Sequence, residues 1–509
     1  MTSSAARRVA LALAALVIAA YGNSFHNAFH FDDDHAIVDN PFVRSVRFVP
    51  RYFVDARTFS VLPPNQSYRP VTQTTFAIDY AIHGYDPLAF HVDTFVWFAA
   101  LLVALCVLVA ALTGSRGAAL AATAAFGLHP AVADTVNYIV QRGEIIAALG
   151  VVAGLALFVR APASRRAGWY LAPVVAGILA KQSAVVFPPL LAAYLWSSEQ
   201  RIRTRDVALS AVVTALTAAW VAARTPPSTV YGTSPAILYR LTQPFVALRY
   251  AWTFVAPVSL SVDYDWSLVD GAGDPRVLAG VVFIGGLAVA IWRLRRSTST
   301  GTAAFGLAWF LIAQLPTAIV PLSEVANDWR MLLPFVGLAI AVGGAVAHVV
   351  GPEGASRRAS AGVRVGTAAA IVAVAIAEAA GVRARNEVWR TDVSLWRDAA
   401  AKSPENARAW MNLGVALMGR GDYGAAAEVC ERALVLAPAY TLVHVNLGVA
   451  YGEIDRQADA EREFLTAQRL APDDWRTHVY YGRWLEREGR AGEARRELER
   501  ARALNPAAP

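Results

Sequence analysis

Long apolar segments recur along the first three quarters of the chain, separated by short polar ones. An apolar helix needs about 20 residues to cross a bilayer, so segments of this kind are interpreted as membrane-spanning helices. Several are shorter than that, above all 117–128 and those within 168–196. The eleven candidates are 9–21, 95–113, 117–128, 145–159, 168–180, 183–196, 206–223, 277–292, 302–320, 332–350 and 365–381. The pattern predicts an all-α, polytopic membrane helix bundle over residues 1–382.

After residue 382 the sequence becomes charged and rich in Ala, Arg and Glu, and it repeats with a period of 34 residues. Residues that recur at this spacing are Pro404, Pro438, Pro472 and Pro506; Leu413-Gly414, Leu447-Gly448 and Tyr481-Gly482; Ala433, Ala467 and Ala501; and Trp410, His444 and His478. This pattern resembles the tetratricopeptide repeat, a helix pair that stacks into a superhelix. We predict a connecting helix over 383–403 and about three repeats over 404–509, whose concave face can take an extended peptide.

Composition agrees with a membrane protein: 56% of the residues are hydrophobic and 17% are charged, against about a quarter charged in a soluble domain. The net charge of +7 does not indicate a nucleic-acid partner, because much of the Arg excess lies in short loops, where it orients membrane helices. The two cysteines, Cys106 and Cys430, offer neither a disulfide framework nor a metal site.

Loop charges predict the orientation of the bundle. With Arg7 and Arg8 in the cytoplasm, every second loop should be cytoplasmic, and each of these carries basic residues. They are the loops at 114–117, 160–166, 197–205, 293–299 and 351–364. An odd number of spans then places the loop 22–94 and the repeat domain outside the cytoplasm.

Two segments allow another interpretation. The first apolar segment is expected to be an uncleaved signal anchor, with a cleaved signal peptide as the alternative. Residues 225–276 are expected to form an external loop with an interfacial helix. If 244–260 crosses the membrane instead, the repeat domain lies in the cytoplasm.

Three consecutive acids, Asp32, Asp33 and Asp34, follow the first apolar segment within "FHFDDDHAIVDN". Alone, such a run is usually a solvated turn. Other outward segments, however, place polar and charged groups at a comparable depth, and polar groups gather around a shared cavity because exposure to lipid is costly. These groups are His129, Gln141, Arg142, Glu144, Lys181, Asp328 and Arg330.

This collection suits transfer from a lipid phosphate donor. A carboxylate could take a proton from an acceptor hydroxyl, or it could ligate a divalent cation. Basic side chains could hold the phosphate leaving group. The acids alone do not decide between base and metal ligand.

Five blocks of the chain resemble one family in the same order. They are "FHFDDDHAIVDNP", "SYRPVTQTTFAIDYAIHGYDPLAFHVDTFV", "FGLHPAVADTVNYIVQRGEIIAALG", "LAKQSAVVFPPLLAAYL" and "RNEVWRTDVSLWRDAAAKSPENARAWMNLG". The family is the transmembrane and tetratricopeptide repeat-containing, O-mannosyltransferase-like proteins of glycosyltransferase superfamily C. The resemblance implies transfer of a sugar, such as mannose, from a polyprenyl-phosphate donor to a protein hydroxyl, outside the cytoplasmic membrane.

By this likeness the catalytic base is Asp33 or Asp32, in that order, with Asp34 an additional neighbour. Arg69 is expected near the donor phosphate, with an interfacial anchor as the alternative. Arg142 is expected to bind the phosphate too, as the only basic residue of its loop.

Other positions are less direct matches. His129 either terminates a helix before proline or, like Glu144, belongs to the cavity. Lys181 is followed by Gln182, where the family commonly has an acid, so it either serves the phosphate or extends to the membrane surface.

The stretch "NDWRMLLP" keeps Asp328 as the acid and has Arg330 as its basic residue, but it departs from the family at Trp329 and Leu332. Asp328 and Arg330 are therefore expected only as cavity residues.

Two other classes of protein compete with the transferase. A non-catalytic membrane scaffold would use its repeats to recruit partners and would tolerate loss of the acids. A transporter is disfavoured, because the charged residues gather toward one face and the two halves of the bundle show no internal repeat.

Overall fold

The computed structural model describes residues 3–198, 204–226, 235–297, 299–350 and 361–505, whose regular elements are helices and which contain no β-strand. They form two compact units. Unit 1 comprises Met1–Leu260 and Trp266–Arg390, and unit 2 comprises Ser261–Asp265 and Thr391–Pro509. The boundary falls at Arg390 rather than at the expected residue 382, and a short loop segment, Ser261–Asp265, is part of the C-terminal unit.

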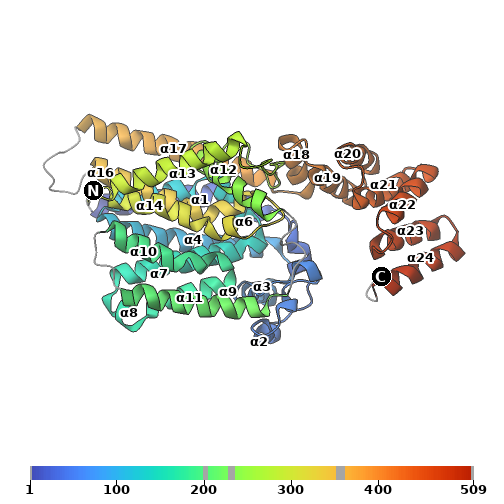
Figure 1. Cartoon of the computed structure of the whole chain (residues 1–509), viewed down its shortest axis with the longest axis horizontal. Helices are drawn as coiled ribbons and strands as arrows, with labels where there is room; N and C mark the ends of the chain where they lie inside the picture. Colours follow the sequence, from blue (N-terminus) through green and yellow to red (C-terminus); the bar gives the residue numbers. More distant parts are fainter. Residues whose placement is uncertain (1–2, 199–203, 227–234, 298, 351–360, 506–509) are drawn as a thin grey trace. The chain divides into compact units, whose positions relative to one another are not determined.

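Each of the eleven predicted segments overlaps a helix of unit 1, and the long helices run roughly side by side (Figure 1). They are α1 (Ser3–Tyr21), α4 (Pro87–Thr113), α5 (Arg116–Gly127), α7 (Arg142–Arg160), α9 (Ala172–Ala180), α10 (Phe187–Ser197), α11 (Thr204–Arg224), α13 (Pro275–Leu294), α14 (Gly301–Ala313), α16 (Leu332–Val350) and α17 (Ala361–Val388). Eight spans in the described residues are long and apolar enough to cross a membrane, whereas α5, α9 and α10 are shorter. The polytopic helical fold is confirmed, and the count of eleven is approximate.

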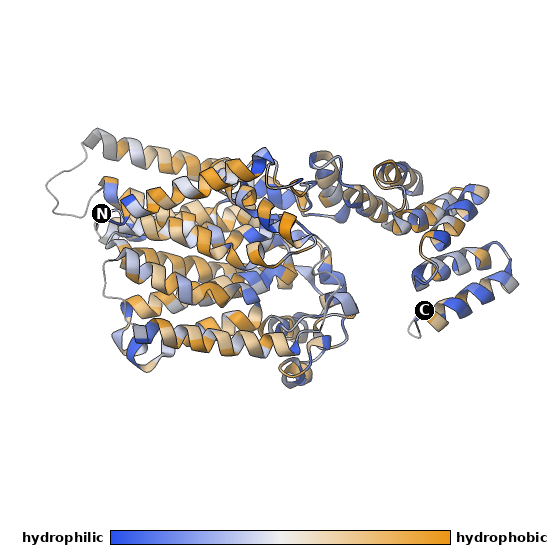
Figure 2. Ribbon diagram, in the orientation of Figure 1, coloured by the Kyte–Doolittle hydropathy of each residue, from blue (hydrophilic) through white to orange (hydrophobic). Residues whose placement is uncertain are grey.

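Shorter elements connect these helices. The α-helices among them are α2 (Val49–Tyr52), α3 (Pro70–His83), α6 (Pro130–Asn137), α8 (Pro162–Ala167), α12 (Ala236–Val255) and α15 (Leu315–Ile319). The remaining turns are η1 (Ser24–His26), η2 (Asp34–Val38), η3 (Val46–Phe48), η4 (Ala56–Phe59), η5 (Pro63–Asn65), η6 (Ile139–Gln141), η7 (Trp169–Leu171), η8 (Gln182–Val186) and η9 (Asp328–Met331). Hydrophobic residues follow the lengths of the long helices of unit 1, and polar residues gather toward their ends (Figure 2).

Small residues bring the membrane helices into close contact. A Cβ atom added to Gly306 of α14 would lie 2.4 Å from the Gly337 carbonyl oxygen and the Ala341 nitrogen of α16. A Cβ atom added to Gly280 of α13 would lie 2.3 Å from the carbonyl carbon of Pro244 in α12. Close backbone approach is the usual basis of helix packing where solvent gives no hydrophobic driving force.

One end of unit 1 gathers the connections that carry basic residues. Thr302 donates to the Leu112 carbonyl at 3.4 Å, which brings the start of α14 to the end of α4. The Tyr170 hydroxyl donates to the Asp206 carbonyl at 3.2 Å, next to the start of α11. A Cβ atom added to Gly301 would lie 2.8 Å from the Ser197 carbonyl oxygen, which brings the connection before α11 to the one before α14. Arg116, Arg165 and Arg293 therefore lie at one end, as the alternation of basic loops predicted. Parts of two predicted basic loops, 199–203 and 351–360, lie outside the described residues.

Both ends of α12 contact the opposite end of the bundle. Tyr239 donates to the Thr317 carbonyl at 2.8 Å, and Tyr250 donates to the Asn327 carbonyl at 3.0 Å. Thr317 and Asn327 belong to the same connection, between α14 and α16. The helix starts at Ala236, earlier than the 244–260 segment considered above, and these contacts favour the interfacial interpretation over a crossing.

Unit 2 consists of helix pairs with the predicted 34-residue period. After α18 (Asp392–Lys402), the pairs are α19 (Ala407–Gly419) with α20 (Tyr423–Leu436), α21 (Thr441–Glu453) with α22 (Gln457–Leu470), and α23 (Trp475–Arg487) with α24 (Ala491–Leu504). Gly414, Gly448 and Gly482 lie where the helices of each pair meet: an added Cβ would come within 2.3 Å of Cys430 Sγ, 2.7 Å of Phe464 and 3.0 Å of Leu498. The predicted repeat fold is confirmed, while Pro506 lies outside the described residues.

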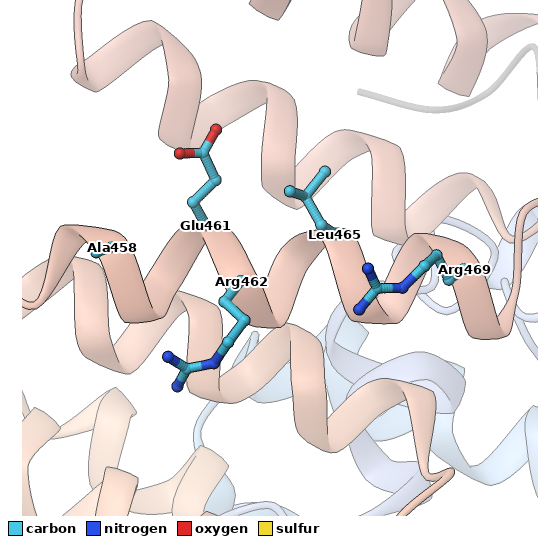
Figure 3. Close-up of a pocket in the computed structure, with 5 residues that line it drawn as sticks. All are labelled: Ala458, Glu461, Arg462, Leu465 and Arg469. Atoms are coloured by element: carbon cyan, nitrogen blue, oxygen red, sulfur yellow. The ribbon is translucent and has the colours of Figure 1, made fainter.

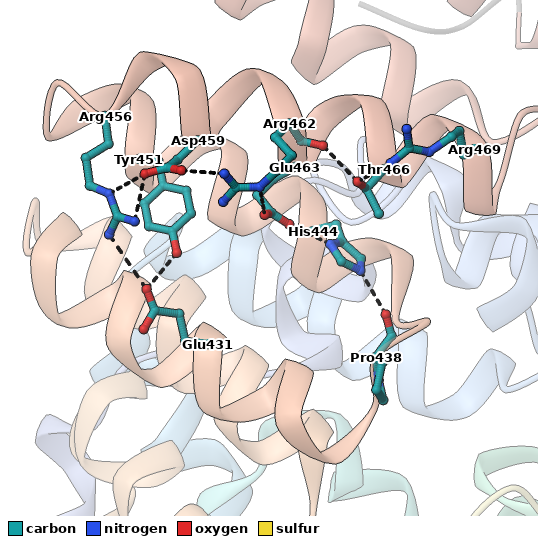
Figure 4. A network of polar contacts seen from close by, with 10 residues as sticks. All are labelled: Glu431, Pro438, His444, Tyr451, Arg456, Asp459, Arg462, Glu463, Thr466 and Arg469. Carbon is teal, nitrogen blue, oxygen red and sulfur yellow. Dashed lines mark hydrogen bonds and ion pairs between the residues drawn. The ribbon is translucent and has the colours of Figure 1, made fainter.

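The recurring proline and aromatic positions also contact each other within each repeat. Trp410 Nε1 donates to the Pro404 carbonyl, and the Nε2 atoms of His444 and His478 lie 2.9 and 3.0 Å from the carbonyls of Pro438 and Pro472. Figure 4 shows the surroundings of His444, where Nδ1 lies 2.7 Å from Glu463 Oε2 and Arg462 pairs with Asp459.

A shallow pocket lies along α22, lined by Ala458, Glu461, Arg462, Leu465 and Arg469 (Figure 3). Its polar side chains have partners. Glu461 accepts from the Tyr481 hydroxyl and from Arg490, and Arg469 donates to Thr466. We place no ligand site there.

Candidate functional site

The three aspartates follow a sharp bend after α1. Phe31 has a positive φ of 54°, a backbone conformation that non-glycine residues adopt rarely and that is frequent at functional sites. The chain then enters η2 at Asp34. This bend gives Asp32 and Asp33, although adjacent in the chain, different surroundings.

Asp33 is buried and holds the loop in place. Its Oδ1 accepts from the Val140 backbone N–H at 2.8 Å, and its Oδ2 accepts from the His30 N–H at 3.0 Å. Burial raises the pKa of Asp33 to about 7, against the opposing effect of these two hydrogen bonds. With both oxygens engaged by main-chain donors, Asp33 ties the loop to η6.

Asp32 is the accessible carboxylate, with a side chain that is 44% exposed. Its Oδ1 lies 3.1 Å from His35 Nε2, and its backbone N–H donates to the Tyr138 hydroxyl at 3.3 Å. Burial acts to raise its pKa, but the hydrogen bond and charge of His35, with help from Tyr138 and Arg69, hold the pKa of Asp32 below its ordinary value. Asp32 is therefore ionised at neutral pH and able to accept a proton.

Arg69 lies immediately before α3, within electrostatic range of Asp32. Its guanidinium lies over the Phe59 ring, 5.0 Å from the centroid. Its Nε atom is buried and has no hydrogen-bond partner among the described residues. A buried donor without a partner is costly, so Arg69 is poised for an anion.

Lys181 and Glu144 form an ion pair beside this arginine. Lys181 Nζ lies 2.9 Å from Glu144 Oε2 and donates to Gln141 Oε1 at 2.5 Å. Burial lowers the pKa of Lys181, as do the positive charges of Arg69 and Arg330, while Glu144 opposes them. The acid that Gln182 does not supply in sequence is thus supplied by α7. Arg69 and Arg330 both lie close enough to Lys181 to act on its charge, and the three cations form the basic part of the site.

Arg330 and Asp328 lie on η9. Arg330 donates to the Glu324 carbonyl at 2.9 Å, with the Glu324 carboxylate 3.8 Å away, and Asp328 is buried. Trp329 between them packs edge-on against Tyr138, with ring centroids 5.5 Å apart. The position that departs from the family pattern therefore contacts the aromatic residue that supports Asp32.

Arg142 does not fit the predicted contact with phosphate. It is fully buried in unit 1, where its guanidinium lies 2.6 Å from Asp79 and 3.0 Å from Asp93. It also donates to Thr75, to Thr94 and to the Phe90 carbonyl. Because its donors all face partners within unit 1, Arg142 holds α3, α4 and α7 together. The geometry indicates that it stabilises the fold.

His129 acts as a helix cap. Its Nδ1 accepts from the Ala131 N–H at 3.2 Å, and its Nε2 lies 3.3 Å from the Phe254 carbonyl. The ring stacks on Phe254 with centroids 5.2 Å apart. His129 thus caps the start of α6 before Pro130, whereas α5 already ends at Gly127. Its expected place in the cavity stays a prediction.

Several residues that hold the site were not singled out in the sequence. Trp389 stacks on Tyr138 and accepts a contact from His30 Nε2 through its carbonyl at 2.5 Å. Asp134 accepts from Trp389 Nε1 and from Arg385 Nε, at 2.5 and 2.7 Å. These partners are more than 250 residues apart in the chain, so no local pattern could reveal the pairing.

A divalent cation finds few ligands at this site. Of the described His, Cys, Asp and Glu side chains, no three gather in a way that could hold a metal ion. The Oδ1 atom of Asp32 lies 3.1 Å from His35 Nε2, and main-chain donors occupy both oxygens of Asp33.

The chain is a polytopic helical membrane protein with a C-terminal tetratricopeptide repeat domain. A tetratricopeptide repeat family profile matches residues 393–441. Protein O-mannosyl-transferase Tmtc3 of Drosophila melanogaster is 21% identical over 91% of this chain and 58% of its own length. Protein O-mannosyl-transferase TMTC3 of Mus musculus is 22% identical over 90% of this chain and 54% of its own length. The chain thus spans little more than half the length of these relatives.

The predicted resemblance to the transmembrane and tetratricopeptide repeat-containing, O-mannosyltransferase-like family is therefore confirmed along nearly the whole chain. Among solved structures, ArnT from Cupriavidus metallidurans in the apo state matches at a TM-score of 0.40 and 16% identity. That match covers 93% of this chain and 81% of ArnT.

Proposed function

We propose that the protein is a membrane glycosyltransferase that moves a sugar from a polyprenyl-phosphate donor to a hydroxyl of a protein acceptor, on the extracytoplasmic side of the membrane. Relatives named as protein O-mannosyl-transferases support the class and favour mannose as the sugar. The observation that carries the proposal is the juxtaposition of an ionised, accessible Asp32 with Arg69, which itself lies within range of Lys181.

In this proposal, Asp32 accepts the proton of the acceptor hydroxyl, and the oxygen attacks the anomeric carbon of the sugar. The bond between that carbon and the phosphate oxygen breaks, and polyprenyl phosphate leaves as an anion. Arg69 and Lys181 stabilise the charge that develops on the phosphate, with Arg330 contributing at longer range. His35 holds the Asp32 carboxylate in its ionised form, and Asp33 holds the loop.

Asp32 takes the role of base in preference to Asp33, because the oxygens of Asp33 already accept from two main-chain N–H groups. Arg142 is left out of the phosphate site for the corresponding reason, since its donors face Asp79, Asp93 and neighbouring polar groups. Asp34 is exposed at the start of η2 and is the matched control for the acids.

The test is turnover by the purified protein of a panel of polyprenyl-phosphate sugars with a Ser/Thr-containing acceptor. We expect turnover of at least one donor, a 10²–10⁴-fold loss in Asp32→Asn, as is typical for removal of a general base, and little change in Asp34→Asn. Repeating the assay with a chelator tests for a required cation. A folded protein that turns over no donor would instead support a non-catalytic scaffold acting through its repeats.

A further inference from the structure

Apolar side chains are exposed in the loop between α1 and α3. Val46 is 48% exposed, Phe53 38% and Val54 67%. All three belong to residues 44–57, which include η3 and α2, and we call this stretch the arginine-rich segment. Buried Tyr52 anchors the segment in unit 1. Exposed apolar side chains that occur singly need no explanation, but three within one short segment form a patch.

The same segment carries an excess of positive charge, four arginines against one acid, Asp55. The guanidinium nitrogens of Arg51 and Arg57 lie 3.1 and 2.9 Å from the Asp55 carboxylate and share its single negative charge. Arg47 lies close to Arg51, because their guanidinium groups cover two phenylalanine rings that pack edge-on with centroids 5.5 Å apart. The three arginines are exposed, so a basic group adjoins the apolar patch.

The arginine-rich segment lies beside the end of a membrane span. The helix α11 is long and apolar enough to cross a membrane, and Trp220 lies four residues before its end at Arg224. Trp220 Nε1 donates to the Tyr68 hydroxyl at 3.0 Å, and that hydroxyl donates to the Phe53 carbonyl at 2.8 Å. Trp and Tyr gather where the hydrocarbon of a membrane meets water. Phe53 thus lies at the depth of the membrane interface, and Figure 1 shows α2 at the edge of unit 1.

We propose that the arginine-rich segment binds the surface of the membrane that holds unit 1. Its exposed apolar side chains enter the interface between acyl chains and headgroups, and its arginines contact the phosphate groups of anionic phospholipids. Arginine suits this position, because its stem covers apolar surface while the guanidinium stays among the headgroups. The partner is the phospholipid of the bilayer and not a sugar donor, so the inference is independent of the transfer reaction.

The test uses the full-length protein in nanodiscs without any sugar donor. After replacement of Cys106 and Cys430 by alanine, Val54→Cys carries a fluorescent nitrobenzoxadiazole label. The nanodiscs contain phosphatidylcholine and phosphatidylglycerol in one fixed mixture. Bromine atoms, which quench the label, are placed on the acyl chains of the same small amount of one lipid or of the other. Quenching then reports which lipid lies next to residue 54.

We expect both brominated lipids to quench the label. Brominated phosphatidylglycerol should quench at least about twofold more strongly, because each arginine near the surface attracts an anionic headgroup. Equal quenching by the two lipids would overturn the contact with anionic headgroups. Absence of quenching by either lipid would overturn membrane binding altogether and leave the patch to a protein partner.

Charge variants of the labelled protein test the arginines themselves. Arg51→Gln/Arg57→Gln should lose most of the preference for phosphatidylglycerol. Arg47→Gln should lose part of it without disturbing the fold, because Arg47 forms no ion pair among the described residues. The matched control is Arg293→Gln/Arg296→Gln, which removes two exposed charges at the opposite end of unit 1 and should keep the preference. An equal loss in this control and in Arg51→Gln/Arg57→Gln would contradict the proposal.

Discussion

At the scale of single residues, Asp32 and Asp33 are adjacent carboxylates that differ in exposure and in hydrogen-bond partners. Asp32 points toward His35 and is partly exposed, while Asp33 is enclosed by main-chain donors from His30 and Val140. The sequence predicts a pair of important acids, and the resemblance implies a base. The resemblance ranks Asp33 before Asp32 as the base, and we propose the reverse order. The sequence could not reveal this, because the choice depends on Val140, which lies 107 residues away.

Asp33→Asn should therefore act on stability first. The variant places an amide N–H₂ against the N–H of Val140 or His30, and one buried donor is left without an acceptor. Such a loss costs about 1–3 kcal/mol. We expect a lower melting temperature for the detergent-solubilised variant. A variant that melts like the wild type while losing turnover as completely as Asp32→Asn would return Asp33 to the role of base.

Substitution of Arg142 is expected to lower thermal stability, whereas substitution of Arg69 is expected to lower the transfer rate. Arg142→Gln leaves Asp79 and Asp93 without their cation, and breaking a buried pair costs about 3–5 kcal/mol. Arg69→Gln removes a guanidinium whose Nε has no hydrogen-bond partner among the described residues, so the fold should melt normally. Its transfer rate should fall about 10²–10³-fold, as on removal of one transition-state donor. Thermal melting and turnover of both variants separate the two roles, and a reversed pattern would contradict the assignment.

At the scale of elements, the apolar pattern predicted a helix at each of the eleven segments, because a long apolar segment has few alternatives in a bilayer. The short helices of the loop 22–94, such as α3, were not predicted, since they carry no span-length apolar pattern. The connecting helix expected at 383–403 is divided: α17 continues to Val388 and α18 begins at Asp392. Buried Trp389 and the capping box at Thr391 account for the break.

The crossing of α14 and α16 depends on the absence of a side chain at Gly306. In Gly306→Ala the new methyl group would lie 2.4 Å from backbone atoms of α16, and overpacking of this kind costs about 1–3 kcal/mol. Gly285→Ala is the control, because a Cβ at Gly285 meets nothing within 4 Å and alanine favours a helix. Melting should be lowered only in Gly306→Ala, and equal effects of the two changes would contradict the close crossing.

His444 should make the repeat domain sensitive to pH. Burial lowers its pKa, but Glu463 and the Pro438 carbonyl face the two ring nitrogens and raise the pKa above its ordinary value on balance. The folded state then holds the proton more tightly than the unfolded state. The stabilisation is complete below the unfolded histidine pKa and is lost as pH rises through the folded value.

His444→Gln tests this dependence by hydrogen exchange in α21 and α22. The variant should exchange faster than the wild type near pH 6, and the difference should shrink toward pH 8.5. A difference that is constant across this range would show that protonation of His444 does not contribute.

At the scale of the whole molecule, the sequence predicts both the order of the domains and the grouping of basic loops at one end of unit 1. The contacts Thr302–Leu112 and Tyr170–Asp206 agree with that grouping. The opposite end of unit 1 holds Asp32, Arg69, Lys181 and Arg330. The pairings that build this end, such as His30 with Trp389, join residues 359 positions apart and could not be predicted from local pattern.

The proposed function requires Asp32 to lie on the extracytoplasmic side of the membrane. A donor sugar attached to a polyprenyl lipid can be used only on the side to which it is exposed. The most direct test of this central claim is labelling of single cysteines with a membrane-impermeant maleimide, after replacement of Cys106 and Cys430. Asp34→Cys reports the aspartate loop, and Ser297→Cys reports the basic end, since both positions are exposed. We predict that intact cells label at position 34 and that position 297 labels only after permeabilisation. Labelling of position 297 in intact cells, with position 34 protected, would contradict the account.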